Sequence, residues 1–279
     1  MSHGADERYT LSTGSTGAAR LKLLDEVYGP STREFLKRVG LAEGMAVADI
    51  GCGIGTVTCW MAAQVGKNGR VVAIDSSPEQ LAYARDMASG KGLHNVEFVV
   101  GSAYDTKLPK ASLDIVFCRL LLAHLKTPLA AISEMASLLK PGGLLVCEEP
   151  DYSGARTYPP TDCYDNALEY GLARGVDPIV GVKLPGLCHE AGLSVRAINV
   201  DQPAILEGEA KRYWELTVSE LAPRLVELGR FTQQHMDKHI RSLHKISTDS
   251  STLLFLPAKV QVAAVSAEQR EQGQACINA

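Results

Sequence analysis

The first 150 residues alternate short apolar segments with longer amphipathic ones. The apolar segments are residues 46–50, 71–75, 96–100, 113–118 and 144–148, and several are rich in valine and isoleucine. Runs of this length and composition predict buried β-strands. Because helical patterns separate them, the chain predicts βα units with right-handed crossovers and a mostly parallel sheet.

The rest of the chain adds two strands and more helices. Residues 163–174 and 179–191 have helical patterns, residues 193–200 predict a sixth strand, and residues 252–265 contain a seventh. Between the last two strands, residues 209–245 place leucines at helical spacing and predict one or two amphipathic helices. The predicted fold class is therefore α/β, with a seven-stranded sheet, helices on both faces and a helical insertion before the last strand.

The N-terminal region predicts a helix that docks against this core. Residues 18–28 place Leu21, Leu24, Val27 and Tyr28 on one helical face. We expect a single domain, because the length does not require two. Its predicted parts are an N-terminal helical lid (1–40), a cofactor-binding core (41–200), a helical cap insertion (201–250), the final strand (251–268) and a tail (269–279).

Composition and charge narrow the class of protein. The chain is 46% hydrophobic and 22% charged, as in ordinary globular proteins, and its net charge of −4 provides no overall attraction to nucleic acid. It has no apolar run of about 18 residues and no hydrophobic leader at its start, so we expect no membrane segment and a cytoplasmic location. The seven cysteines lack C-x-x-C spacing and are expected to be reduced.

Residues 47–58, V-A-D-I-G-C-G-I-G-T-V-T, predict a strand, a tight turn and the start of a helix. Glycine allows backbone angles that a Cβ forbids and lets a ligand approach the main chain closely. The dinucleotide fingerprint G-x-G-x-x-G would need its third glycine at position 56, which is Thr56. The loop therefore predicts a nucleotide-type cradle of another kind.

A carboxylate follows the second predicted strand. Asp75 lies twenty residues after Gly55, where an acidic residue can bind both hydroxyls of a ribose. Such charge-assisted hydrogen bonds contribute about 1.5–3 kcal/mol each. The alternative role is that of a helix N-cap, because a helical pattern follows directly.

Together these motifs resemble class I S-adenosylmethionine (SAM) dependent methyltransferases. The loop matches the pattern D-x-G-x-G-x-G, and L-K-P-G-G at residues 139–143 precedes a strand, as in that family. The resemblance covers residues 46–151 and includes bacterial small-molecule enzymes of the UbiE-like, quinone-pathway type. It implies a Rossmann-like sheet, SAM as cofactor, S-adenosylhomocysteine as product and an antiparallel last strand.

The same resemblance implies a set of cofactor-binding residues: Tyr9, Asp49, Gly51, Cys52, Gly53, Gly55, Asp75, Ser76, Ser102, Ala103, Tyr104 and Arg119. The sequence departs from the family at Ser102, where an acidic residue that binds adenine is common. Asp105 could replace that acid.

The acceptor is expected beyond the fourth strand. We expect His124, Arg119 and Glu149 as catalytic residues. His124 would be a base or a substrate clamp, and Arg119 would pair with a carboxylate such as Glu149 or with the cofactor. A helix histidine bound to backbone is the alternative for His124. Expected substrate contacts are Tyr28, Asp151 and Tyr213. Core packing is the alternative for Tyr28, as it is for Trp214.

Several patterns exclude other substrates. Glu148, Glu149 and Asp151 do not predict a metal site, because adjacent strand residues point to opposite faces. The chain has no Pro-Cys dipeptide, no N-P-P-Y after the fourth strand and no basic stripe, so we expect a small-molecule acceptor and no nucleic acid partner. The oligomeric state stays open, a homodimer included. Two alternative functions are a SAM-binding protein without transferase activity and an NAD-dependent oxidoreductase, against which Thr56 argues.

Overall fold

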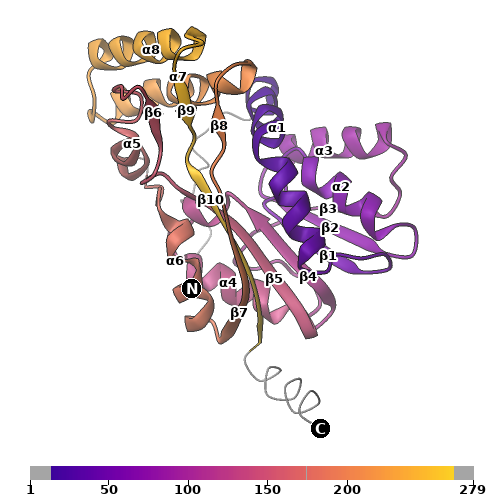
Figure 1. Cartoon of the computed structure of the whole chain (residues 1–279). Coiled ribbons are helices and arrows are strands. Elements are labelled where there is room, and N and C mark those ends of the chain that lie inside the picture. The colour runs from indigo at the N-terminus through magenta and orange to yellow at the C-terminus, as the bar shows by residue number, and fades with distance from the viewer. Residues whose placement is uncertain (1–13, 174, 267–279) are drawn as a thin grey trace.

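The computed structural model describes residues 14–173 and 175–266, and its centre is a seven-stranded sheet (Figure 1). The strand order is β3-β2-β1-β4-β5-β10-β7. The strands are β1 (Ala46–Ile50), β2 (Arg70–Asp75), β3 (Val96–Val100), β4 (Leu113–Arg119), β5 (Leu139–Asp151), β7 (Leu193–Asp201) and β10 (Ala258–Ser266). Only β10 runs antiparallel to its neighbours, β5 and β7. The predicted α/β class, strand number and antiparallel last strand are confirmed.

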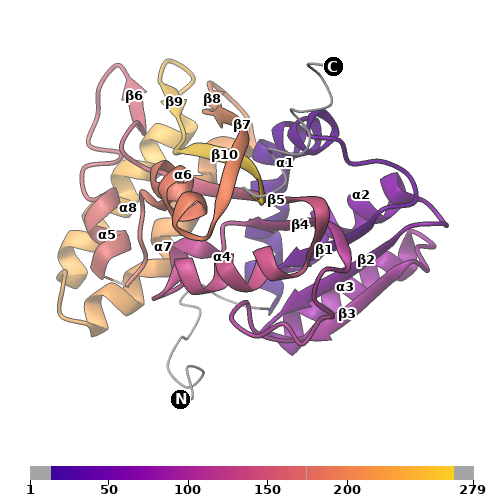
Figure 2. The same cartoon turned by 90° about the horizontal axis from the view of Figure 1, so that it is seen from below.

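Helices cover both faces of this sheet (Figure 2). On one face, α2 (Thr56–Val65) and the second half of α1 (Gly14–Arg38) pack on the sheet, beside α3 (Pro78–Gly90). On the other face lie α4 (Pro128–Ser137) and α6 (Val180–Glu190). A 3-10 turn, η1 (Leu122–His124), precedes α4, so His124 lies before that helix and not within it. Each face of the sheet has its own apolar cluster.

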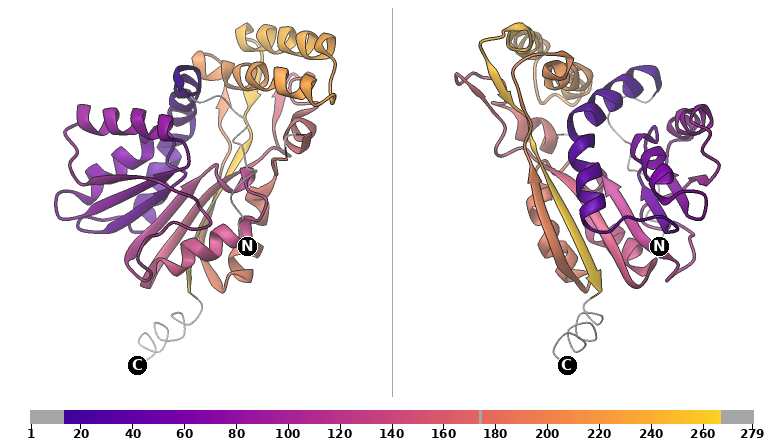
Figure 3. Two further views of the ribbon diagram at one scale, coloured as in Figure 1. Left: turned by 180° about the vertical axis from the view of Figure 1, so that it is seen from behind. Right: turned by 45° about the vertical axis from the view of Figure 1, so that its right-hand side comes forward.

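A third apolar cluster builds a cap over the carboxyl ends of the parallel strands (Figure 3). The cap comprises α5 (Ala167–Ala173), η2 (Glu209–Arg212), α7 (Tyr213–Glu227), α8 (Gln233–Thr248) and a small sheet of β6 (Arg156–Tyr158), β9 (Leu253–Phe255) and β8 (Ala204–Ile205). The two helices of the predicted insertion are present. The small sheet was not predicted, because strands of two or three residues carry no readable alternation.

Helix α1 connects the cap with the sheet. Leu23, Leu24 and Tyr28 belong to the cap cluster, whereas Phe35 and Leu36 belong to the cluster that packs on the sheet. The predicted helix ended at Tyr28, before a Gly-Pro pair that disfavours helix interiors. The structure continues the helix through that pair to Arg38, because its second half has an apolar face of its own to bury. None of the described helices is long and apolar enough to cross a membrane.

Candidate active site

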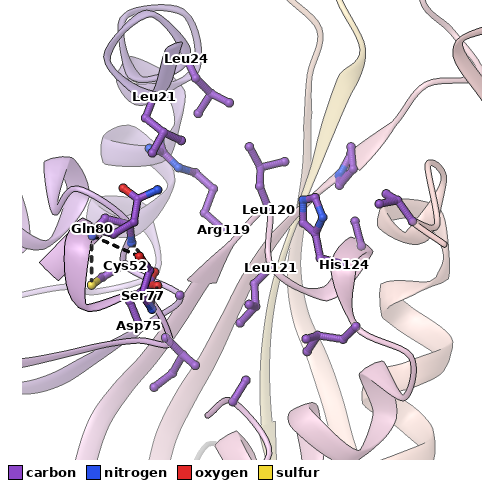
Figure 4. A pocket seen from close by; sticks show the side chains of 18 of the residues that line it. Leu21, Leu24, Cys52, Asp75, Ser77, Gln80, Arg119, Leu120, Leu121 and His124 are labelled. Atoms are coloured by element: carbon purple, nitrogen blue, oxygen red, sulfur yellow. Dashed lines mark hydrogen bonds between the residues drawn. The ribbon is translucent and has the colours of Figure 1, made fainter. Parts of the chain in front are cut away.

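One cavity of about 370 Å³ lies between the carboxyl ends of the strands and the cap. Its volume is in the range of small-molecule sites. Figure 4 shows Asp75, Gln80 and Cys52 on one side of it, His124 on the other, Arg119 between them, and Leu24 of α1 above. The cavity therefore joins the predicted cofactor residues to the predicted acceptor residues.

The glycine loop forms one wall of the cavity. All three glycines have positive φ: 75° at Gly51, 54° at Gly53 and 78° at Gly55. The backbone N–H groups of Gly51 and Cys52 donate to the carbonyl oxygen of Ile74 at 2.7 and 3.0 Å, which fixes the loop to β2. Gly51, Cys52 and Gly53 line the cavity, as expected of a cradle.

Gly55 has a different role from the one expected. It is absent from the cavity wall, and a Cβ at this position would lie 2.8 Å from the Cβ of Ala84 on α3. The expected cofactor contact is therefore corrected: Gly55 allows α2 and α3 to pack closely.

Asp75 presents its carboxylate to the cavity. Oδ2 accepts the Gly53 N–H at 2.8 Å and Oδ1 accepts the Ser77 N–H at 2.9 Å. Each carboxylate oxygen has a further lone pair for a ligand hydroxyl. Burial raises the pKa of Asp75, although these N–H groups oppose the shift. The N-cap of α3 is Ser77, whose hydroxyl accepts the Gln80 N–H at 3.3 Å, so the alternative role for Asp75 is wrong.

The surroundings of Asp75 fit an adenosine group. Its neighbours on the cavity wall include four further predicted residues: Ser76, Ser102, Ala103 and Tyr104. The side-chain oxygen of Gln80 also lies at the cavity, and it is buried without a hydrogen-bond partner among the described residues. A ligand donor would satisfy this oxygen. Asp105 lies off the cavity wall and pairs with Lys107, and Tyr9 lies outside the described residues.

Asp49 lies beneath the loop at the end of β1. It lines the cavity, and the Thr58 hydroxyl donates to its Oδ2 at 2.5 Å. Burial raises the pKa of Asp49 to about 6, while the Thr58 hydroxyl and the Arg119 charge act in the opposite direction.

Arg119 ends β4 and lines the cavity, but its partners differ from those expected. Its guanidinium donates to Asp25 Oδ1 at 3.0 Å and to the Thr32 hydroxyl at 3.2 Å. Both partners belong to α1. The expected pairing of Arg119 with a carboxylate is confirmed, but the partner is Asp25 and not Glu149, whose carboxylate accepts backbone N–H groups.

Glu149 supports the loop after β4 without touching the cavity. Its side chain is fully buried, off the cavity wall, and accepts the N–H groups of Leu121, Leu122 and Ala123 at 2.9, 2.8 and 3.2 Å. Burial raises the pKa of Glu149 to about 7. The expected catalytic role is therefore corrected to that of a positioning residue. The loop that it binds presents Leu121 and His124 to the cavity.

One of the three expected substrate residues lies on the cavity wall and the other two do not. Tyr213 of α7 lines the cavity. Tyr28 is buried off the cavity wall, where its hydroxyl donates to the Pro257 carbonyl at 2.8 Å, so core packing was the correct alternative. Asp151 is also absent from the wall, because its Oδ1 accepts the backbone and hydroxyl of Ser153 in a local turn.

Other cavity residues were not predicted as site residues. They include Lys259 of β10, Gln80 and Arg20, together with the aromatic side chains of Tyr152 and Tyr170; Trp214, for which core packing was the alternative, also lies on the wall. Lys259 is 3% exposed, and burial lowers its pKa to about 7. The signal was a lysine inside the apolar run L-L-F-L-P-A-K-V-Q-V-A-A-V, because lysine is almost never fully buried without a specific role. Within the described residues no group of three or more acidic, histidine or cysteine side chains could hold a metal ion.

Comparisons with known proteins agree with this site. The model of a methyltransferase domain family matches residues 41–182, which is half of the chain. An uncharacterized methyltransferase of Schizosaccharomyces pombe is 31% identical over 58% of this chain and 57% of its own. The demethylmenaquinone methyltransferase of Lactococcus lactis is 30% identical over 52% of this chain and 55% of its own. The chain thus spans little more than half the length of these curated relatives.

A solved structure extends the likeness to the fold. The crystal structure of a SAM dependent methyltransferase from Aquifex aeolicus has a TM-score of 0.50 and 26% identity, and it covers 60% of this chain and 81% of its own. With the loop, Asp75 and the sheet order, these matches show that the chain belongs to the class I SAM-dependent methyltransferase family. S-adenosylmethionine is accordingly its cofactor.

Proposed function

We propose that the protein transfers the methyl group of SAM to a small-molecule acceptor. The observation that carries this proposal is the continuous cavity that runs from Asp75 to the side chains of the cap. An acceptor next to the cofactor would lie beneath α1 and α7, whose side chains Leu24 and Tyr213 line the cavity. The Lactococcus relative, named for demethylmenaquinone, supports a small acceptor.

The acceptor end of the cavity favours an aromatic or otherwise apolar molecule. Tyr152, Tyr170, Tyr213 and Trp214 contribute to its walls. Trp214 is held in place by the bond from its ring N–H to the Cys163 carbonyl at 2.8 Å, and its ring lies 5.5 Å from that of Tyr152. Such fixed rings provide contact area with little loss of side-chain entropy.

In methyl transfer the protein's own residues align the acceptor, exclude water and accept a proton. SAM supplies an electrophilic methyl group, so alignment of the acceptor is the main requirement and is worth up to about 7–11 kcal/mol in well-oriented systems. The cap keeps water from the reacting atoms. His124 accepts the proton of a hydroxyl or amine acceptor, since it faces the cavity on the turn that Glu149 holds.

Binding and transfer experiments test this proposal. Calorimetry should show binding of SAM and S-adenosylhomocysteine and none of NAD at the same concentration. SAM with a radiolabelled methyl group is then incubated with small-molecule, protein and RNA fractions of a cell extract, and label should enter the small-molecule fraction. Label confined to RNA or protein would contradict the proposal. SAM binding with no labelled product would favour a SAM-binding protein without transferase activity, and NAD binding alone would favour an oxidoreductase.

A further inference from the structure

We propose that Lys259 binds an anionic oxygen of the acceptor, so that the acceptor is an aromatic or apolar molecule with a carboxylate or phenolate group. This inference rests on the proposed function and assigns its substrate class. Lys259 lies on the cavity wall and is 3% exposed.

The Lys259 side chain lacks a hydrogen-bond partner. Its Nζ lies 4.4 Å from the ring centroid of Tyr28, and within residues 14–173 and 175–266 it has neither a hydrogen bond nor an ion pair. The other buried lysine, Lys211, donates from its Nζ to the Asp249 carbonyl. An ammonium group has three donors, and burying them unpaired is costly. A hydrogen bond to a ligand oxygen in the cavity would offset that cost.

Lys259 lies far from the glycine loop, so its position favours contact with the acceptor over contact with the cofactor. Lys259 is opposite Pro150 in the antiparallel pair of β10 and β5, so it lies at the carboxyl edge of the sheet. Three strand spacings separate β10 from β1 in the sheet order, which is about 14 Å at about 4.8 Å each. Arg119, on β4, lies between the two.

The neighbouring charged groups do not satisfy Lys259. Carboxyls of Glu149, Glu148 and Asp201 raise its pKa and the Arg119 charge lowers it, but burial has the largest effect. Glu149 is occupied by three backbone N–H groups, and Glu148 accepts from Thr32 at 2.7 Å and Gln261 at 2.7 Å. Asp201 is half-buried, burial raises its pKa, and it forms no ion pair with Lys259 among the described residues. These carboxyls favour the protonated form of Lys259, but they do not accept its hydrogen bonds. The Lys259 amine can therefore donate to a ligand.

The aromatic walls complete the recognition. Tyr213 and Trp214 of α7, together with Tyr152 and Tyr170, provide ring surfaces, whereas Lys259 provides a cation. A ligand that matches both has a flat or apolar body and one acidic oxygen. A neutral amide of the same shape would keep the ring contacts and lose the charge-assisted bond.

Binding of matched probe pairs to the full chain loaded with S-adenosylhomocysteine tests this inference. The pairs are cinnamate and cinnamamide, indoleacetate and indoleacetamide for a carboxylate, and nitrophenol and nitroanisole for a phenolate. Calorimetry of the wild type should give at least one acidic probe an affinity about tenfold above that of its neutral match. Lys259→Met should bring that ratio near one and leave the affinity for S-adenosylhomocysteine unchanged. Lys259→Arg should retain the preference.

The control is Lys140→Met, which removes a surface lysine that pairs with Asp114. Lys140 lies at the start of β5, at the end of the strand away from the cavity. This variant should leave the ratio as in the wild type. Equal affinities within every wild-type pair, no binding of any acidic probe, or an unchanged preference in Lys259→Met would each overturn the inference. Failure of the wild type to bind S-adenosylhomocysteine would instead overturn the proposed function.

Discussion

Two carboxylates near the cavity, Asp75 and Glu149, have different roles. Both accept backbone N–H groups, but Asp75 uses two and faces the cavity, whereas Glu149 uses three and is fully buried. The first therefore has acceptor capacity left for a ligand, and the second holds a loop in place. The number of backbone donors and the exposure of the oxygens separate a binding residue from a positioning residue.

Replacement of Asp75 should weaken cofactor binding strongly. In Asp75→Ala two charge-assisted bonds to the ribose are lost, so the dissociation constant of S-adenosylhomocysteine should rise about 30-fold to 1000-fold, or roughly 2–4 kcal/mol. Calorimetry measures this change, and circular dichroism verifies the fold. Asp105→Ala is the control, because Asp105 lies off the cavity wall and should leave binding unchanged. An unaltered affinity in folded Asp75→Ala would refute the ribose contact.

Local chemistry decides which site residues the sequence could predict. The glycine loop and Asp75 were predictable because the loop follows one strand, the carboxylate ends the next strand, and the number of residues between them is typical of such sites. The partners of Arg119 were not, because Asp25 lies 94 residues away and on a helix whose docking no local pattern specifies. The same limit applies to Lys259, whose role depends on β10 lying next to β5.

At the scale of elements, α1 is held to the cap by a buried ion pair. Arg20 Nε and Glu220 Oε2 are 2.8 Å apart, and both side chains are less than one tenth exposed. A second contact, from Tyr28 to the Pro257 carbonyl, holds the middle of the helix. Helix α1 therefore roofs the cavity by specific polar contacts as well as by its apolar face.

Loss of the ion pair should loosen α1 and α7 more than the sheet. In Glu220→Gln the Arg20 charge loses its buried carboxylate, a change that typically costs about 3–5 kcal/mol. Hydrogen exchange should show faster exchange in the first half of α1 and in α7, with little change in β1 and β4. The control is Glu227→Gln on the same helix, because its pair with Arg224 is exposed and worth at most about 1 kcal/mol. Equal exchange in both variants would show that the buried pair does not hold the helix.

The elements themselves differ in how well the sequence predicts them. All seven strands of the large sheet were predicted from apolar runs with turn signals, although the edge strands β3 and β7 are only partly buried. Helix α1 was predicted only to Tyr28, although it continues to Arg38 through Gly29 and Pro30. Tertiary packing overrides local propensity there, and it also creates the small sheet of the cap.

At the scale of the whole molecule, the buried charges concentrate where the cap meets the sheet. The apolar clusters of the two sheet faces and of the cap are separate, and the cavity lies at their junction. Glu148, Glu149, Lys259 and Asp49 are all buried there. A protein that needed only stability would fill this junction with apolar side chains, so the charges are retained at a cost that ligand binding can offset.

This arrangement predicts an unusual dependence of stability on pH. Burial raises the pKa values of Glu148 and Glu149 from 4.5 to about 7 and lowers that of Lys259 from 10.5 to about 7. Between pH 4.5 and 7 the folded protein therefore holds protons that the unfolded chain has released, and the free energy of unfolding should fall as pH rises. Above pH 7 the unfolded chain holds the lysine proton that the folded protein has released, so these groups should make the free energy of unfolding rise again.

Urea denaturation of the ligand-free protein at a series of pH values measures this dependence. Glu148→Gln removes one of the two carboxyls and should reduce the downward slope between pH 4.5 and 7 by up to about 1.4 kcal/mol per pH unit. Glu227→Gln, which removes a surface carboxyl that is 69% exposed, is the control and should keep the wild-type slope. A slope that is the same in wild type and Glu148→Gln would mean that Glu148 is ionised in the folded protein throughout this range. In that case the field of Arg119 and Lys259 would outweigh the effect of burial at the junction.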